Sequence, residues 1–190
     1  MQLSALARGI LIALGLVWVL VEVRQSRVVR ADASRADRGS REVVVLAIGA
    51  GLVAAVAVAR WVPSAALPPS AVVGWIGCGL VAFGIVLRIW SIRTLGRYFT
   101  FTVQTSGDQP VITAGPYRVV RHPGYTGLLL LSVGIGLLLA NWLAVVVVTA
   151  AATGGLSYRI RIEERELLRD LGPAYREYAA TRKRLIPFIW

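Results

Sequence analysis

Long blocks of apolar residues, nearly free of charge, dominate this chain of 190 residues. Polar segments separate five such blocks, which are Leu3–Val23, Val43–Trp61, Ala71–Trp90, Gly124–Ala140 and Trp142–Tyr158. Because a helix rises about 1.5 Å per residue, about 20 apolar residues cross a hydrocarbon core about 30 Å thick. The blocks therefore predict an all-α integral membrane protein that crosses the bilayer about five times.

The composition agrees with a membrane protein, since 56% of the residues are hydrophobic and 16% are charged, whereas about a quarter of a soluble domain is charged. The first block, Leu3–Val23, is too long for a signal peptide and lacks a small-residue cleavage site, so we expect it to span the membrane. The single cysteine, Cys78, excludes an internal disulfide and a cysteine-based zinc cluster. We expect it to be a small buried residue, and we expect no metal site.

The net charge is +11, and all but one of the 21 basic residues are arginine. A strongly basic chain can indicate nucleic-acid binding. Here the charges lie between apolar blocks, where arginine anchors helix ends at anionic headgroups. We therefore expect membrane lipids as partners and no nucleic acid.

The distribution of charge predicts how the chain is oriented. Residues 24–42, 88–123 and 159–190 hold 19 of the 21 basic residues. Because basic segments stay on the cytoplasmic side, all three are expected in the cytoplasm, with the N-terminus outside and the C-terminus cytoplasmic. This predicts a multi-pass protein of the cell (inner) membrane, and the Ala/Val/Arg-rich composition suggests a prokaryotic source of high GC content.

The polar segments divide the chain into two regions. We expect residues 1–90 to hold three N-terminal transmembrane helices with an arginine-rich cytoplasmic loop at 24–42. Residues 91–190 are expected to hold a polar cytoplasmic stretch, a helical hairpin at 124–158 and an amphipathic cytoplasmic tail. The hairpin should be antiparallel, because Asn141 leaves almost no linker between its two helices.

Glycines in the third and fourth blocks predict close helix packing, which helps to drive helix association in lipid. They are Gly74, Gly77, Gly79, Gly84, Gly134 and Gly136. The sequence has no Gly-rich loop of the Rossmann or P-loop form, and no predicted cytoplasmic segment exceeds 36 residues. We therefore expect any cofactor to bind to loops and helix ends at the membrane surface.

The single histidine, His122, precedes Pro123 at the predicted start of the fourth block. Proline at the first helical position favours a helix start, whose free N–H groups can receive an anion. A histidine at this position can simply cap the helix. However, Tyr117, Arg121 and Tyr125 lie around the same start, so the cluster favours a binding pocket.

Arg159 and Glu163 lie four residues apart just past the last apolar block, so they share a helix face at the membrane surface. A solvated helix with ordinary ion pairs would show the same spacing. Carboxylates that face a bundle at this depth, however, tend to be functional. Glu163 could hold an ammonium or lie near a sulfonium, and Arg159 could bind a carboxylate through two parallel hydrogen bonds.

The order of polar residues in the second half of the chain resembles the isoprenylcysteine carboxyl methyltransferase family. The residues that carry the resemblance are Gln104, Gly115, Tyr117, Arg121, His122, Pro123, Tyr125, Gly127, Asn141, Arg159, Glu163, Glu164, Leu167, Gly172, Tyr175, Tyr178 and Pro187. The likeness extends over roughly 74–187, and Asp37-Arg-Gly-Ser40 is also similar to bacterial members. Membrane methyltransferases that act on phospholipid amines and on small thiols share part of this pattern.

This resemblance implies a methyltransferase core at 91–190, with S-adenosyl-L-methionine as methyl donor. It assigns cofactor binding to Gln104, Gln109, Pro110, Val111, Ile112, Tyr117, His122, Pro123, Gly124, Tyr125, Glu163 and Glu164. It assigns catalytic roles to Glu163 and to Arg159, which would face the carboxylate of the acceptor. At Gln109 the chain departs from the eukaryotic members, which carry a histidine there, so backbone contacts are expected in that loop.

Methyl transfer from a sulfonium is a single in-line displacement, which needs an aligned donor and acceptor and little covalent help. The expected acceptor is the carboxylate of a prenylated cysteine or of a similar isoprenoid or lipid. It would enter sideways from the bilayer, and the cofactor would enter from the cytosol. The alternatives are a thiol or phospholipid-amine methyltransferase, a sterol-type reductase that uses a nicotinamide, and a non-enzymatic membrane scaffold or small channel subunit.

Overall fold

The computed structural model describes residues 39–98, 110–187 and 189–190. Within these ranges the chain forms four α-helices, which are α2 (Ser40–Trp61), α3 (Ala71–Leu95), α4 (Pro123–Leu138) and α5 (Trp142–Thr181). The short 3-10 helices are η1 (Pro63–Ala65), η2 (Gly96–Tyr98) and η3 (Gly115–Arg118). The predicted first span, Leu3–Val23, and most of the predicted loop at 24–42 lie outside the described residues.

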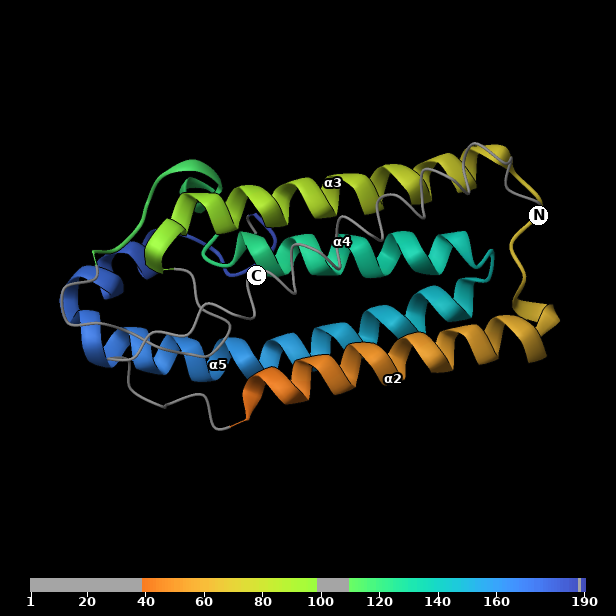
Figure 1. The fold of residues 1–190 in the computed structure, drawn as a ribbon, viewed down its shortest axis with the longest axis horizontal. Helices are drawn as coiled ribbons and strands as arrows, with labels where there is room; N and C mark the ends of the chain where they lie inside the picture. The colour runs from red at the N-terminus through yellow and green to blue at the C-terminus, as the bar shows by residue number, and fades with distance from the viewer. Residues whose placement is uncertain (1–38, 99–109, 188) are drawn as a thin grey trace.

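The four long helices lie lengthwise and alternate in direction (Figure 1). α3 packs along α4, α2 packs along α5, and α4 joins the two pairs by packing against α5. The α4–α5 turn is held by Asn141, whose side chain accepts a hydrogen bond from the amide of Ala144 at 3.0 Å. The same side chain donates to the carbonyl of Val62 at 3.0 Å, so Asn141 also ties this turn to the end of α2.

Glycines line the seam between α3 and α4. A Cβ at Gly84 would lie 2.6 Å from the carbonyl oxygen of Gly127, and one at Gly134 would lie 2.8 Å from that of Gly77. The two contacts are seven residues apart on both helices, which places them two turns apart along one face. Gly79 differs, because no residue that the structure describes lies within 4 Å of a Cβ there, so close packing at this position stays a prediction.

The contacts of α5 use small residues in the same way. A Cβ at Gly51 of α2 would lie 2.5 Å from the Cβ of Ala151. A Cβ at Gly136 of α4 would lie 2.6 Å from the Cα of Val145. Close approach of two backbones strengthens the van der Waals packing between helices. The hydrophobic effect contributes little to helix association in lipid, so these glycines help to stabilise the bundle.

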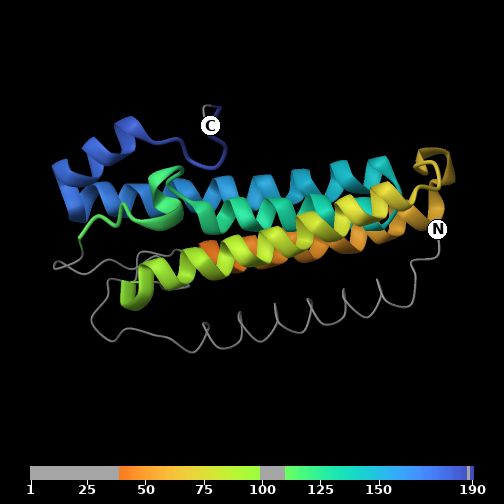
Figure 2. The same cartoon turned by 90° about the horizontal axis from the view of Figure 1, so that it is seen from above.

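Three described helices, α2, α3 and α5, are long and apolar enough to cross a membrane, and α4 is a shorter apolar helix. The straight part of α5, residues 142–171, holds 30 residues, which reach about 45 Å and exceed the hydrocarbon core of about 30 Å. Its apolar part, 142–158, therefore spans the membrane, and its polar part projects beyond it. Gly172 has a φ of 55° and ends the straight part of α5, after which the chain folds back over the end of the bundle (Figure 2).

Several helix boundaries differ from the predicted blocks, including the end of α5, which lies at Thr181 and not at Tyr158. α3 continues to Leu95, beyond the predicted end at Trp90, and α2 already begins at Ser40. Arg88, which the charge count assigned to a cytoplasmic segment, therefore lies two turns inside α3 and is 5% exposed. An arginine can occupy this depth because its long aliphatic stem packs against apolar neighbours while its head reaches a polar region.

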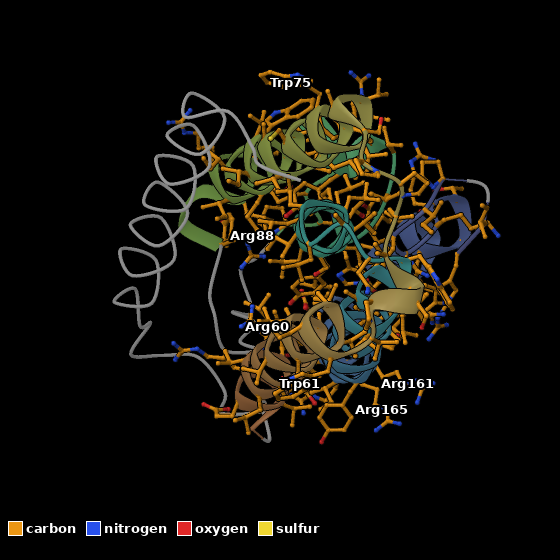
Figure 3. The ribbon with its side chains drawn as sticks, turned by 90° about the vertical axis from the view of Figure 1, so that its right-hand side faces the viewer. Arg60, Trp61, Trp75, Arg88, Arg161 and Arg165 are labelled. Carbon is orange, nitrogen blue, oxygen red and sulfur yellow. The ribbon has the colours of Figure 1, made fainter. Side chains whose placement is uncertain are left out.

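The starts of α2 and α4, the end of α3 and the polar part of α5 lie toward the same end of the bundle (Figure 1). Arg60, Trp61 and Trp75 lie at the opposite end, which faces the viewer in Figure 3. The helix directions thus gather the basic segments that the structure describes at one end. The side of the membrane that this end occupies stays a prediction.

Candidate active site

The C-terminal segment returns to the start of α4 and closes the polar end of the bundle. The amide of Arg121 donates a hydrogen bond to the carbonyl of Lys183 at 2.8 Å. The next amide, of His122, donates to the carbonyl of Arg184 at 2.9 Å. The side chain of Leu185 is fully buried, which anchors the returning segment, so the start of α4 is fixed by a part of the chain about 60 residues away.

Glu164 lies at the centre of a buried ion cluster. Its Oε1 lies 3.0 Å from Nη1 of Arg121 and 3.1 Å from Nε2 of His122. Its Oε2 lies 2.9 Å from both Nε and Nη2 of Arg184. Burial acts to raise the pKa of the Glu164 carboxyl, but the hydrogen bond from His122 and the surrounding positive charges outweigh it, and the pKa falls below its usual range. Glu164 is therefore ionised at neutral pH and fixes the ring of His122.

The hydroxyl of Tyr125 connects the two residues that were predicted to be catalytic. It accepts a hydrogen bond from Nε of Arg159 at 2.6 Å and donates one to Oε2 of Glu163 at 2.6 Å. Arg159 also donates to Oγ of Ser40 at 3.0 Å. The other oxygen of Glu163 lies 3.9 Å from Nδ1 of His122. Residues from α2, α4 and α5 therefore meet in one polar centre at this end of the bundle.

His122 stands at the N-cap position of α4, yet its side chain makes no cap hydrogen bond. The ring instead lies between the carboxylates of Glu163 and Glu164. It also stacks on the ring of Tyr125, with a centroid separation of 5.6 Å and an interplanar angle of 14°. The alternative of a simple helix-capping histidine is therefore wrong for this side chain.

Two tyrosines hold the segment that precedes α4. Tyr117 lies in η3 and is buried, with its hydroxyl 3.5 Å from the carbonyl oxygen of Ser91. Tyr178, on the returning part of α5, donates to the carbonyl of Tyr117 at 2.7 Å. Burial, together with the nearby charge of Glu163, raises the pKa of the Tyr117 hydroxyl well above its usual value. Tyr117 is therefore a neutral hydrogen-bond donor at physiological pH.

Arg88 extends from α3 to the first turn of α4. A Cβ at Gly124 would lie 3.2 Å from Nη1 of Arg88, which is tighter than an ordinary van der Waals contact. Glycine at this position therefore leaves room for the guanidinium beside the start of α4. Figure 3 shows the Arg88 side chain on the inner side of α3.

The structure brings together eight residues that the sequence assigned to the site. They are Tyr117, His122, Pro123, Gly124, Tyr125, Arg159, Glu163 and Glu164. Pro110 is exposed, and Val111 and Ile112 are half-buried in the connection that leads to η3, so a cofactor contact by these three stays a prediction. Gln104 and Gln109 lie outside the described residues.

The residues at this end that were not among the predicted site residues include Ser40, Arg88, Tyr175 and Arg184. Three of them had a signal in the sequence, because Ser40 belongs to the upstream motif, Arg88 is a charge inside an apolar block and Tyr175 is one of the residues that carry the family resemblance. Arg184 had none. Tyr175 and Arg184 are brought to the site by the chain reversal at Gly172, which no local pattern specifies.

Two buried donors near Glu164 have no hydrogen-bond partner within the described part of the chain, the hydroxyl of Tyr175 and Nε of Arg121. Burial and the charges of Glu164 and Glu163 raise the pKa of the Tyr175 hydroxyl, so it remains a donor. An unpaired buried donor costs about 1–3 kcal/mol, and native structures contain few of them. Their presence beside the ion cluster indicates a place where polar atoms of a ligand can bind.

Helices of spanning length with a polar, densely hydrogen-bonded centre at one end define an all-α integral membrane protein with its candidate site at one end of the bundle. Residues 75–169, from the second turn of α3 into the polar part of α5, match the model of the isoprenylcysteine carboxyl methyltransferase (ICMT) family. The chain belongs to this family.

Individual relatives agree with this assignment. The chain is 37% identical over 119 residues to a probable protein-S-isoprenylcysteine O-methyltransferase of Oryza sativa subsp. japonica, over 62% of each chain. It is 38% identical over 116 residues to the protein-S-isoprenylcysteine O-methyltransferase of Xenopus laevis, over 60% of this chain and 40% of that protein. The expectation of a prokaryotic source is not borne out, because the relatives found are eukaryotic.

The fold is also similar to a solved structure of a eukaryotic intramembrane Ras methyltransferase ICMT. The TM-score is 0.64 at 32% sequence identity, over 76% of this chain and 52% of that chain. The matched region spans at most 62% of the length of the Oryza and Xenopus proteins. The similarity therefore extends to the helices and to the polar end, and the Xenopus protein is longer than this chain.

Proposed function

We propose that the chain is a membrane-embedded methyltransferase that uses S-adenosyl-L-methionine to methylate the carboxylate of a prenylated cysteine or of a similar lipophilic acceptor. The observation that carries the proposal is the bridge from Arg159 to Glu163 through the hydroxyl of Tyr125. The bridge holds the guanidinium of Arg159, which can bind a carboxylate, beside the carboxylate of Glu163, which can bind a cationic methyl donor. The relatives that share these helices are named protein-S-isoprenylcysteine O-methyltransferases.

The residues on the His122 side of this bridge suit the methyl donor. When bound, the donor supplies a methyl group on a positively charged sulfur for in-line transfer. The carboxylate of Glu163 would hold its cationic part, because opposite charges attract strongly in a partly desolvated site. The unpaired donors of Tyr175 and Arg121 would bind its polar acceptor atoms, and Tyr117 and His122 would line the same space.

The residues on the Arg159 side suit the acceptor. Arg159 is 6% exposed and has its Nε fixed by Tyr125 and one Nη fixed by Ser40. A guanidinium that is already oriented loses little entropy when it binds a carboxylate. Because Arg159 directly follows the apolar part of α5, the carboxylate would lie at the membrane surface while a prenyl tail stays in the hydrocarbon.

Methyl transfer requires little from this chain beyond the orientation of the two reactants. A carboxylate acceptor is already ionised at neutral pH, so no general base is required. Arg159 and Glu163 would align the two reactants, and well-oriented reactants react faster by several orders of magnitude. Glu164 would act as a positioning residue through His122. The region 91–190 would then form the methyltransferase core, with the preceding helices completing the bundle.

We also propose that the polar end of the bundle faces the cytoplasm, with the N-terminus on the outer side of the membrane. The support is the charge distribution, since 19 of the 21 basic residues fall in the three segments assigned to that side. Substitution of Arg60 and of Arg176 by cysteine, in a Cys78→Ala background, allows labelling with a membrane-impermeant maleimide. Intact cells should label position 60 and not position 176, and the reverse pattern would contradict this orientation.

The function is tested by a methyl-transfer assay with the purified chain in detergent and labelled S-adenosyl-L-methionine. N-acetyl-S-farnesylcysteine, a long-chain thiol and phosphatidylethanolamine serve as parallel acceptors. The proposal predicts transfer to the farnesylcysteine carboxylate, seen as a base-labile methyl ester, and little to the other two. Transfer to the thiol or the amine alone would favour the related classes, and binding of NADPH without methyl transfer would favour a reductase.

A further inference from the structure

Exposed aromatic side chains mark two levels along the bundle. On α3 these are Trp75 and Trp90, and on α5 they are Trp142 and Tyr158. The first pair is 15 residues apart and the second 16, which correspond to about 22 Å and 24 Å along a helix. Because α3 and α5 run in the same direction and exposed Trp and Tyr gather at membrane–water interfaces, the two helices independently mark the same two edges of the hydrocarbon core.

An exposed arginine follows each aromatic residue at the polar end. Arg93 lies three residues after Trp90, and Arg161 lies three residues after Tyr158, so each arginine shares a helix face with its aromatic neighbour. A separation of three residues along a helix places each arginine about 4.5 Å beyond its aromatic neighbour. This position corresponds to the depth of the lipid headgroups, just outside the hydrocarbon core. Arg165 follows Arg161 by one turn on the same face.

Arg161 and Arg165 of α5 point away from the site. At 100° per residue, Arg161 is turned about 200° from Arg159 around the helix axis, so they occupy opposite faces. Figure 3 shows the side chains of Arg161 and Arg165 projecting from α5 out of the bundle. Within the described part of the chain these two make no hydrogen bond or ion pair, whereas Arg169 further along pairs with Asp170.

We propose that Tyr158, Arg161 and Arg165 form a binding site for the phosphate headgroup of an anionic phospholipid, in the leaflet at the polar end of the bundle. Two guanidinium groups one turn apart can donate hydrogen bonds to two oxygens of one phosphate. The ring of Tyr158 packs below them, at the depth of the lipid glycerol. Zwitterionic headgroups carry their own ammonium, which weakens the attraction, so the site selects anionic lipids. A lipid bound here holds α5 at a fixed depth and keeps Arg159, on the opposite face, at the membrane surface.

The test uses native mass spectrometry of the full chain in detergent, incubated with an equimolar mixture of phosphatidylglycerol and phosphatidylcholine. The variants are R161Q/R165Q and a control, R60Q/R176Q, which removes the same charge from exposed arginines elsewhere. Each arginine near an anionic surface contributes about fivefold in affinity, so the first variant should lose the preference for phosphatidylglycerol by about 10- to 30-fold. The control should keep it within about twofold, because Arg60 and Arg176 lie outside the proposed site.

Three outcomes would overturn the proposal. They are a wild-type chain with no preference, an R161Q/R165Q variant that keeps it, and equal losses in both variants, which would indicate diffuse charge rather than a site. A thermal-unfolding curve for each variant establishes that the compared proteins are folded. The readout is lipid retention and not methyl transfer, so failure here leaves the proposed function untouched.

Discussion

Nε2 of His122 lies 3.1 Å from Oε1 of Glu164, although 42 residues separate them in the sequence. The contact joins the start of α4 to the polar part of α5 and sets the orientation of the histidine ring between two carboxylates. Arg121 and Arg184 complete the shell around Glu164. The alignment of the site therefore depends on one carboxylate that itself has no direct part in the proposed chemistry.

Replacement of Glu164 by Gln should destabilise the protein. The variant removes the negative charge that Arg121 and Arg184 share in a buried setting, and breaking a buried ion pair from one side costs about 3–5 kcal/mol. Thermal unfolding in detergent measures the loss as a lower Tm. Glu177→Gln is the matched control, because Glu177 is exposed on the returning part of α5. Equal Tm values for the two variants would contradict the role of the cluster.

The same carboxylate gives a pH dependence with a defined sign. Its pKa is lower in the folded chain than the ordinary value of 4.5, so the folded state holds its proton less tightly than the unfolded state. The contribution of Glu164 to stability is therefore complete above about pH 4.5 and is lost as the pH falls through the lowered pKa. The wild type should lose stability more steeply than Glu164→Gln below pH 4.5, and parallel curves would exclude this linkage.

Two glycines of α3 should respond to alanine in opposite ways. At Gly84 the new Cβ would meet the carbonyl oxygen of Gly127 at 2.6 Å, so α3 and α4 must move apart, at about 1–3 kcal/mol for overpacking. At Gly79 no described residue lies within 4 Å of the new Cβ, and alanine there should stabilise the helix by up to about 1 kcal/mol. Unfolding of Gly84→Ala and Gly79→Ala in detergent compares them. A similar Tm for both variants would show that the α3–α4 seam is looser than these distances indicate.

Tyr175 and Tyr178 lie one turn apart and differ in their hydrogen bonds. Tyr178 donates to the carbonyl of Tyr117, so Tyr178→Phe should lower stability by about 1 kcal/mol. Tyr175 donates to no group that the structure describes, so Tyr175→Phe should leave stability unchanged or raise it, while weakening the binding of S-adenosyl-L-methionine. Chemical denaturation and donor titration of both variants separate the two roles. Unchanged donor binding in Tyr175→Phe would remove Tyr175 from the site.

Tyr125→Phe should impair methyl transfer far more than it impairs folding. The variant keeps the ring but loses the hydroxyl that fixes Arg159 and Glu163 relative to each other. Misplacement of reacting groups by about 1 Å can reduce the rate about 100-fold, so a loss of that order in kcat/KM is expected. The control is Ser64→Ala, which removes an exposed hydroxyl in η1, outside the site. Full activity of Tyr125→Phe would show that the bridge does not align the reactants.

The sequence predicted the helical membrane architecture because spanning helices must be long and apolar, and that requirement is visible in a single chain. Most positions of the described site were also predictable, since His122, Arg159 and Glu163 are polar residues at the ends of apolar blocks. The contacts that the C-terminal segment makes with the site were not predictable. Arg184 and Tyr175 reach the site because the chain reverses at Gly172. A reversal at one residue changes the direction of the following segment but does not change the hydrophobic periodicity of the sequence, so it could not be predicted. The burial of Arg88 was missed for a related reason, because a charge near a helix end resembles the start of a loop.

The central claim is that Glu163 binds the methyl donor beside His122. Calorimetric titration of the purified chain with S-adenosyl-L-methionine, in parallel for the wild type, Glu163→Gln and the exposed control Glu177→Gln, tests it directly. Hydrogen bonds to a charged group contribute about 1.5–3 kcal/mol, so Glu163→Gln should raise the Kd about 10- to 100-fold, with Glu177→Gln unchanged. An unaltered Kd for a folded Glu163→Gln protein would contradict the account.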